Sequence, residues 1–544
     1  MPASGASVRQ AGPTCDVAAA LALWLLSAAP LDAQATRAER TAYRETSSYA
    51  DVLGFLDSLR IRGAGIAIDT LAITSTGRVV PLVVAARPVV RLPAEAARSG
   101  KPIVYLQANI HAGEVEGKEV AQMLLRDLTL GSLRPLLDSL VLLVVPIYNV
   151  DGNEVLARGE ENRPGQNGPA IVGRRANAQG LDLNRDYVKL EAPETRGSAA
   201  LLSAWRPQLF VDLHTTNGSY HGYALTWSPG LNPNSTPANA WVRDTLLPEV
   251  SHRMLERHGR ATFSYGNFLN QDPDSLVLGW ATYDARARFG SNWYAMRGGM
   301  AVLSEAYSND DYATRAASTY AFVRELLSEV ARSRGAVLRL TAVRPAAESV
   351  VVRSTLGPPT PGRVVAEITE PAGEGNGGYA RRRRTGVFRI IEMPVFDRFA
   401  AARKEAVPDA YLIPDRLAGV VELLRRQGID VVRGSARASQ LERFMVDNVR
   451  REPLFEGHRP LVVEGRWTRY AGEVGSSWYR VYTAQPLGLL AAYLLEPASE
   501  DGIVTWNLLD AELTPGHAYP ILRTRMAASA TATQPGRAAD DQPR

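Results

Sequence analysis

Apolar runs typical of buried strands alternate along the chain with segments of helical periodicity. The strand-like runs are rich in β-branched residues and cover 89–91, 103–110, 141–149, 209–214 and 301–307. Helical patterns precede or separate them at 49–56, 115–128 and 194–205. Such alternation is typical of an α/β domain, so we predict a mixed, largely parallel central sheet flanked by helices.

The pattern changes after this domain, which we place at 36–343. Residues 344–363 combine four prolines with an Ala/Ser/Gly background and predict a linker. Residues 364–526 predict a smaller C-terminal α+β domain, to which the sequence assigns no role. Residues 527–544 are rich in Ala, Thr, Pro and Asp and predict a disordered tail.

The first 35 residues have the features of an export signal. An apolar stretch runs from Val17 to Leu31, and Ala33 and Ala35 form a small-x-small cleavage site. The stretch is shorter than the ~20 residues of a membrane-spanning helix. We therefore favour a cleaved signal peptide at 1–35 over an uncleaved anchor, and predict a mature protein that is secreted or periplasmic and not stably inserted in a membrane.

Composition and charge exclude several other classes of protein. Hydrophobic residues make up 45% of the chain and charged residues 22%, which is ordinary globular composition. The 61 basic and 57 acidic residues leave a net charge of +4 over 544 residues, too little to predict nucleic-acid binding. The only cysteine, Cys15, lies within the predicted signal peptide, so disulfides and cysteine catalysis are excluded from the mature chain.

Candidate chemistry begins where the run 103–110 ends. His111 follows this run directly, and Glu114 stands three residues later, just before the predicted helix at 115–128. A His-x-x-Glu pair at a strand-to-helix corner can bring an imidazole and a carboxylate to one metal, with a third ligand from a distant segment. A surface histidine with a helix-capping glutamate has the same spacing, so the pair alone does not establish a site.

His214 is the candidate third ligand. It ends the run 209–214, and ligands of open α/β sheets bind beyond the carboxyl ends of the strands. Two histidines at two such ends favour a shared site over two separate core histidines. His221 is a competing ligand, but it lies in a loop rich in Gly, Ser, Thr and Asn whose position is less fixed.

Two further segments carry residues suited to a hydrolytic site. Arg185 can hold a carboxylate through two parallel hydrogen bonds, and Asn184 can supply further donors, although a solvent-facing turn would have the same composition. Glu305 follows an apolar strand and is either a solvent-facing charge or a general base. A general base is needed beside a metal-activated water, whose pKa zinc lowers to about 7.

In their order along the chain, these residues resemble the zinc carboxypeptidase family of the carboxypeptidase A and B type. The resemblance extends over about 65–325. It includes two local segments, Tyr-Asn-Val-Asp-Gly at 148–152 and Gly-Leu-Asp-Leu-Asn-Arg-Asp at 180–186. Bacterial secreted members of this family with an appended C-terminal domain are similar to this chain.

The resemblance implies a cofactor and a set of roles. One Zn²⁺ per catalytic domain would be bound by His111, Glu114 and His214. Glu305 would be the general base, and Arg175 would polarise the scissile carbonyl and stabilise the oxyanion.

The resemblance also implies how substrate is held. Asn184 and Arg185 would bind the terminal carboxylate, and Asp182 would orient a zinc-bound imidazole. Tyr283 fits the family spacing of the tyrosine that caps the substrate, with Tyr294 as a competitor.

The expected function is that of a secreted zinc metallocarboxypeptidase. It would hydrolyse the C-terminal peptide bond of peptides with a free terminal carboxylate, using zinc-activated water and Glu305. One alternative is a zinc amidase or deacylase that acts on cell-wall peptides or N-acyl amino acids. Another is an inactive peptide-binding homologue, which the retention of all three ligands and the base disfavours.

Overall fold

The computed structural model describes residues 34–342, 347–372, 382–434, 440–472, 474 and 477–525. The predicted signal peptide 1–35 lies outside the described residues except for its last two, and the predicted tail 527–544 lies outside them entirely. Within these described segments, every helix is too short or too polar to cross a bilayer.

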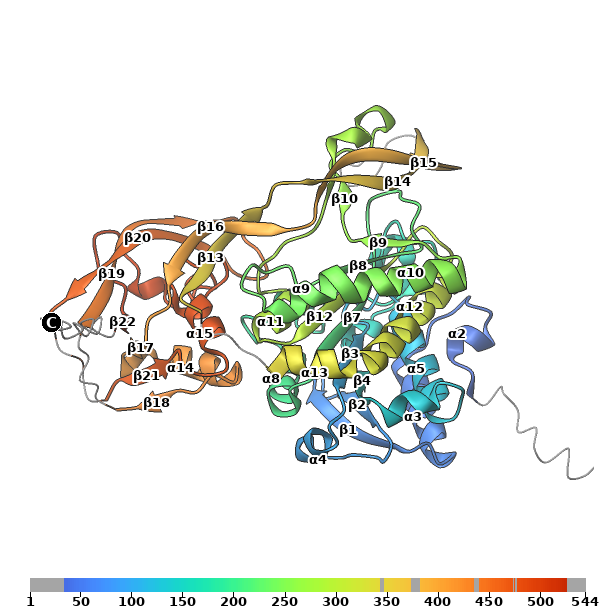
Figure 1. The fold of residues 1–544 in the computed structure, drawn as a ribbon, viewed down its shortest axis with the longest axis horizontal. Coiled ribbons are helices and arrows are strands. Elements are labelled where there is room, and N and C mark those ends of the chain that lie inside the picture. Colours follow the sequence, from blue (N-terminus) through green and yellow to red (C-terminus); the bar gives the residue numbers. More distant parts are fainter. Residues whose placement is uncertain are drawn as a thin grey trace, which may run out of the picture.

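An eight-stranded sheet forms the centre of the N-terminal part (Figure 1). In spatial order it contains β1 (Ile66–Ile73), β2 (Val79–Ala85), β4 (Val141–Val145), β3 (Ile103–Ala108), β7 (Leu209–Thr215), β12 (Met300–Ala306), β8 (Leu225–Pro229) and β9 (Thr262–Ser264). The four central strands β4, β3, β7 and β12 are mutually parallel, whereas β1–β2, β2–β4 and β12–β8 are antiparallel pairs. The predicted mixed, largely parallel sheet is confirmed.

Helices flank this sheet as the hydrophobic periodicity predicted. They include α3 (Tyr49–Ile61), α4 (Pro93–Arg98), α5 (Glu116–Thr129), α8 (Pro193–Trp205), α10 (Leu247–His258), α11 (Gly290–Met296), α12 (Tyr312–Arg332) and α13 (Arg334–Ala342). Helix α5 packs against α3 and α12, whereas α8 packs on β1 and beside α4. The N-terminus of α3 is capped by Ser48, whose hydroxyl accepts the Asp51 N–H while the Asp51 carboxylate binds the Ser48 N–H.

One predicted strand is wrong. Residues 89–91 form no strand, because Pro88 removes a ladder donor and the Arg91 N–H instead donates to the Glu95 carboxylate at 2.7 Å. The run predicted as a strand at 141–149 is shorter than expected, since β4 ends at Val145.

The C-terminal part contains a second, six-stranded sheet. In spatial order it comprises β18 (Val432–Arg433), β21 (Tyr479–Tyr482), β17 (Ala410–Ile413), β22 (Leu522–Arg525), β19 (Gln440–Arg451) and β20 (Leu461–Tyr470). All its strand pairs are antiparallel, and α14 (Ala418–Arg426) and α15 (Gly488–Leu495) accompany it. The expected smaller α+β domain is therefore present.

The prediction of a linker at 344–363 is wrong for residues 347–363, which the structure describes. Instead of an irregular connection, β13 (Ser349–Leu356) and β14 (Thr360–Pro371) begin a two-stranded ribbon that returns through β15 (Arg382–Phe396) and β16 (Phe399–Ala406). Figure 1 shows this ribbon running from the C-terminal domain to the N-terminal domain. There β15 joins β11 (Trp280–Ala281), and Pro358 and Pro359 lie at the bend between β13 and β14.

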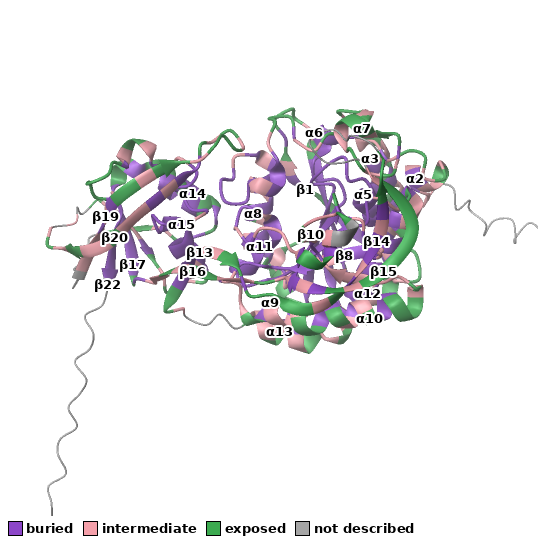
Figure 2. Ribbon diagram, turned by 90° about the horizontal axis from the view of Figure 1, so that it is seen from above, coloured by how far each residue is buried: buried purple, intermediate pink, exposed green. Residues whose placement is uncertain are grey.

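The two domains are held together by a shared interior. One cluster of buried apolar side chains includes Tyr105 and Trp293 of the N-terminal domain together with Tyr411 and Leu494 of the C-terminal domain. Figure 2 shows buried residues concentrated in the centre of both parts. Because burial of apolar surface is the main stabilising contribution, the C-terminal domain is an integral part of the folded chain.

Candidate active site

The predicted metal ligands meet at the carboxyl ends of two adjacent parallel strands. His111 and Glu114 lie in the connection between β3 and α5, and His214 is the next-to-last residue of β7. Because β3 and β7 are parallel neighbours, their carboxyl ends reach the same edge of the sheet. All three side chains are about 4% exposed.

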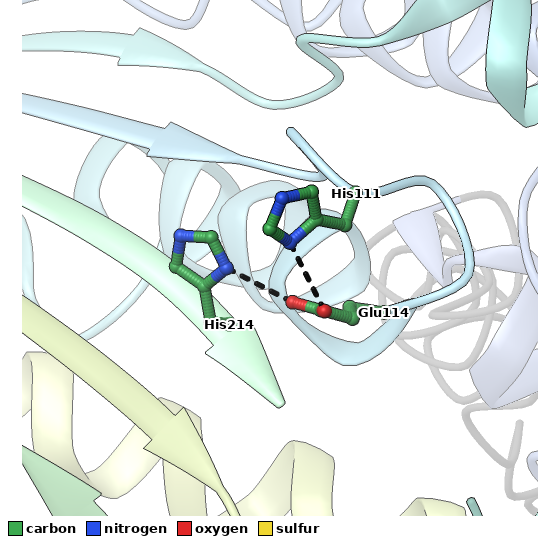
Figure 3. Close-up of side chains that lie close together, drawn as sticks. All are labelled: His111, Glu114 and His214. Atoms are coloured by element: carbon green, nitrogen blue, oxygen red, sulfur yellow. Dashed lines mark hydrogen bonds and ion pairs between the residues drawn. The ribbon is translucent and has the colours of Figure 1, made fainter. Parts of the chain in front are cut away.

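The potential metal-ligand atoms of these three residues point toward one another (Figure 3). Nδ1 of His111 lies 3.0 Å from Oε1 of Glu114, and Nδ1 of His214 lies 2.9 Å from Oε2 of the same carboxylate. One ligand atom from each residue lies within 4.8 Å of the other two. Two imidazoles and a carboxylate in this arrangement have the composition and spacing of a zinc site with an open fourth position.

Each imidazole is oriented from behind by a carboxylate. Nε2 of His111 lies 3.1 Å from Oδ1 of Asp182, and Nε2 of His214 lies 3.0 Å from Oδ2 of Asp212. A proton on each Nε2 faces these carboxylates and leaves the Nδ1 lone pairs facing Glu114, so that acceptor atoms face an acceptor. A cation bound between these acceptor atoms would remove the repulsion between them. Metal-binding histidines are usually supported in this way, by a carboxylate on the second ring nitrogen.

The electrostatic environment keeps Glu114 ionised. Burial alone would raise its pKa, but the nearby His111 and Arg163, together with the close contacts of both imidazoles, hold the pKa of Glu114 well below its usual range. Arg163 lies 3.5 Å from the carboxylate and is anchored by donation to the main-chain oxygens of Thr215 and Thr216. An ionised carboxylate is the form that binds a metal.

Glu305 lies opposite His214 on the neighbouring parallel strand. The register of β7 and β12 pairs these two residues directly. Glu305 is 8% exposed, and its Oε2 has no hydrogen-bond partner among the residues that the structure describes. Burial, together with the charge of Glu114, raises the pKa of Glu305 to about 8 against the opposing charges of His214 and Arg163. A buried carboxylate oxygen without a partner, aimed into a pocket, has the features of a general base.

Arg175 lies beside the metal cluster. Its Nε and Nη2 donate to Oδ2 of Asp182 at 2.9 and 2.8 Å, and its Nη1 lies 3.5 Å from Oε1 of Glu114. Asp182 therefore holds an imidazole with one oxygen and a guanidinium with the other. Burial would raise the pKa of Asp182, but His111 and the arginines keep it well below its usual range.

Asn184 and Arg185 follow Asp182 in a single 3-10 turn, Leu183–Arg185. Asn184 accepts the Gly290 N–H at Oδ1, and its Nδ2 lies 3.5 Å from Nε2 of His214. The Arg185 guanidinium lies over the Phe289 ring, 4.1 Å from its centroid, and donates to the Asn184 main-chain oxygen. The guanidinium therefore lies against an aromatic face, and its planar set of N–H donors suits a planar anion.

The structure separates the two candidate tyrosines. Tyr283 lines the same pocket as the metal ligands, and its hydroxyl lies 2.9 Å from Oγ of Ser291. Tyr294 is buried, stacks on Phe210 and donates to the main-chain oxygen of Pro207. The second tyrosine is therefore a core residue.

His221 lies outside the metal cluster. It is buried against Tyr307 and Trp280, with ring centroids 4.2 and 5.9 Å away, and its Nδ1 accepts the Tyr223 N–H. Burial lowers its pKa to about 3, so it is a neutral core histidine.

The metal ligands and the predicted catalytic and substrate-binding residues surround a cavity of about 100 Å³. Its walls are formed by His111, Glu114, Arg175, Asn184, Arg185, His214, Thr215, Asn217, Tyr265, Tyr283, Phe289, Ser291, Leu303 and Glu305. The structure thus brings together all the predicted site residues, with Asp182 directly behind His111.

Sequence reasoning missed several supporting residues. Asp212 could have been found, because it stands two positions before His214 on one strand and so shares its face. Arg163 and Phe289 carried no such signal, since each reaches the site from a loop distant in sequence.

Comparison with known proteins agrees with this geometry. Residues 64–329 match the family model described as Zinc carboxypeptidase. The chain is 23% identical over 449 residues to Carboxypeptidase 2 of Trichophyton equinum, covering 78% of this chain and 77% of that protein. It is 27% identical over 228 residues to Carboxypeptidase D of Drosophila melanogaster, covering 38% of this chain and 15% of that protein.

Solved structures of similar proteins include two carboxypeptidases. A metallo-carboxypeptidase from Burkholderia cenocepacia matches with a TM-score of 0.39 at 17% identity, over 52% of this chain and 70% of that one. Carboxypeptidase A from Helicoverpa armigera matches with a TM-score of 0.40 at 15% identity, over 60% and 81%. From the family match and the buried His–Glu–His cluster, residues 64–329 are a zinc carboxypeptidase domain, and this domain makes the protein a zinc metallopeptidase.

Proposed function

We propose that this protein removes C-terminal residues from peptides that end in a free carboxylate, and that it does so outside the cytoplasm. The observation that carries the proposal is the single pocket that unites the metal cluster, two arginines and Glu305, whose Oε2 has no hydrogen-bond partner within the described part of the chain. The extracytoplasmic location rests on the predicted signal peptide at 1–35.

The zinc ion would be held by Nδ1 of His111, Nδ1 of His214 and the Glu114 carboxylate. When bound, zinc supplies a Lewis acid that polarises the scissile carbonyl and lowers the pKa of water. Asp182 and Asp212 keep the Nε2 protons of the two histidines in place, which fixes the tautomers that present Nδ1 to the metal.

Glu305 acts as the general base. Its free Oε2 accepts a proton from the attacking water and then delivers that proton to the leaving amine. Arg175, fixed by two hydrogen bonds to Asp182, lies close enough to the Glu114 carboxylate to place positive charge beside the scissile carbonyl. There it stabilises the oxyanion that develops in the transition state.

Asn184 and Arg185 bind the terminal carboxylate of the substrate. Two parallel N–H groups of the guanidinium match the two oxygens of a carboxylate, and Phe289 packs against the guanidinium. Tyr283, between the rings of Tyr265 and Phe289, closes the pocket over the bound residue. Recognition of a free carboxylate limits cleavage to the last peptide bond.

The test compares one short peptide as free acid and as C-terminal amide, using the protein without residues 1–35. We expect cleavage of the acid only, loss of cleavage with a chelator and recovery with zinc. Equal cleavage of both forms would contradict the carboxylate anchor and indicate an endopeptidase. Cleavage of neither, with hydrolysis of a cell-wall peptide or an N-acyl amino acid, would replace the proposal with an amidase or deacylase.

A further inference from the structure

The C-terminal domain reaches the active site through a tight turn between β19 and β20. Phe455 and His458 exchange two main-chain hydrogen bonds, of 2.8 and 3.0 Å, and leave Glu456 and Gly457 as the two turn residues. Both have positive φ, 48° for Glu456 and 78° for Gly457. Asn, Asp or Gly normally occupies the first of these positions, so a glutamate there adopts a strained backbone.

The Glu456 side chain contacts the residue that supports a metal ligand. Its Oε2 accepts the main-chain N–H of Asp182 at 3.1 Å, across 274 positions of sequence. His111 and Arg175 already contact the Asp182 side chain. Glu456 therefore fixes the Asp182 main chain as well, at the start of the Leu183–Arg185 turn. Burial lowers the pKa of Arg185, and the Glu456 carboxylate is one of the charges that oppose this.

The turn itself is clamped against the catalytic domain. Nε2 of His458 lies 2.8 Å from Oε1 of Glu191, and the His458 ring meets Trp506 edge-on. Beside it, Arg288 forms a buried ion pair with Asp501 at 2.9 Å. The position of Glu456 is therefore set by contacts on both sides of the turn.

We propose that Glu456 is a positioning residue of the active site, which acts through the Asp182 main chain to align Asn184 and Arg185 with the terminal carboxylate of the substrate. The inference rests on the proposed function, because it assigns that carboxylate to Arg185. It gives the C-terminal domain a direct part in substrate binding. The Asp182 side chain has its own partners, so zinc binding does not depend on Glu456.

The decisive variant is E456N, because asparagine before glycine is a favoured residue pair for this turn. The shorter side chain relieves the backbone strain but cannot reach the Asp182 N–H. We expect a melting temperature at or above that of the wild type, unchanged zinc content, a kcat within twofold and a KM for a free-acid peptide raised about fivefold. E456Q keeps an oxygen that accepts the N–H, so its KM should stay within twofold of the wild type.

Glu452→Ala in the same connection is the matched control, since Glu452 pairs only with the nearby Arg450 among the described contacts. An unchanged KM in E456N, or an equal rise in E452A, would overturn the proposal. The wild type, assayed in parallel on acid and amide peptides, distinguishes this failure from failure of the proposed function. If the wild type shows no preference for the acid, both proposals fall.

Discussion

Two regions of different construction meet at the active site. The metal edge consists of His111, Glu114, His214 and Glu305, which are buried at the ends of three neighbouring strands. The docking face consists of Glu456, His458, Asp501 and Trp506, which the C-terminal domain presents to the Asp182, Glu191 and Arg288 side of the pocket.

The difference lies in what each region contacts. At the metal edge, charged side chains face one another within about 3 Å, and one carboxylate oxygen is left free. At the docking face, Glu456 contacts the main chain of Asp182, and Trp506 packs against Arg288, the residue before Phe289 of the pocket. If the proposed roles hold, the comparison teaches that one sheet supplies the reactive groups, while a second domain aligns the groups that bind substrate.

Removal of the base should give the largest effect and sharpens the comparison most. In Glu305→Gln the side chain keeps its size but cannot accept a proton, so we expect kcat to fall by about 10²–10⁴-fold. Zinc content should be unchanged, because Glu305 is outside the ligand cluster. Kinetics on a free-acid peptide with metal analysis measures both, and E256Q, at an exposed position of α10, serves as control. Full activity of E305Q would remove the assigned base.

Arg175 links the two regions, because it contacts both Glu114 of the metal edge and Asp182 beside the docking face. Arg175→Met removes the group assigned to the oxyanion, so kcat/KM should fall by about 10²–10³-fold. The neighbouring Arg174 is exposed, and the one hydrogen bond described for its side chain goes to the Asn177 main-chain oxygen, so R174M should retain activity. Similar losses in both variants would contradict a specific role.

The docking face should respond in stability more than in chemistry. Asp501→Asn leaves Arg288 buried without its charge partner, and such a loss costs about 3 kcal/mol of unfolding free energy. D510N breaks an ion pair with Arg451 that is half exposed, and should cost less than about 1 kcal/mol. Denaturant unfolding measures both, and equal costs would show that the Arg288–Asp501 contact does not hold the domains together.

A smaller effect is expected for the carboxylate anchor. Arg185→Lys keeps the charge but loses the planar pair of donors, so KM for free-acid peptides should rise roughly 10- to 100-fold while zinc content stays constant. Steady-state kinetics gives the answer. A kcat loss without a change in KM would place Arg185 in the chemistry instead of in binding.

The smallest effect concerns the place where the β14–β15 ribbon meets the catalytic domain. His221 pairs with Ala366 of this ribbon, and burial lowers its pKa to about 3 from an unfolded value near 6.5. The unfolded state therefore binds the extra proton, so the contribution of His221 to stability is complete above pH 6.5 and is lost as the pH falls toward 3. We expect about 2 kcal/mol of loss between pH 6.5 and 5.

His221→Asn should flatten this dependence, because asparagine can still accept the Tyr223 N–H but does not titrate. His252 on α10 is exposed, so H252N should leave the pH dependence as in the wild type. Unfolding measured at pH 7 and pH 5 compares the three proteins, and an unaltered slope in H221N would exclude His221 as the source.

The central strands and the metal edge were predictable because their signals are local. Long apolar runs predicted β3, β7 and β12, and a polar residue directly after or at the end of each run predicted His111, His214 and Glu305. The outer strands β1, β2, β8 and β9, of which β1 and β9 form the edges, were not predicted, since their burial depends on neighbours distant in sequence. The proline-rich 344–363 was misjudged because β-ribbons tolerate proline at bends and edges.

The supports of the site could not be predicted for a related reason. Glu456 meets Asp182, and Arg163 meets Glu114, only through the tertiary fold. A glutamate before a glycine in a polar turn carries no sequence signal for a contact with a domain 274 positions away. Its strained φ becomes visible only in the structure.

The central claim is that a single metal ion, held by His111, Glu114 and His214, makes this chain a carboxypeptidase. The most direct test is titration of the metal-free protein with zinc while release of the C-terminal residue from a free-acid peptide is followed. We predict no release without zinc and a linear rise to a sharp break at one zinc per chain, with no rise in H214A. Release by the metal-free protein, or an undiminished rise in H214A, would contradict the account.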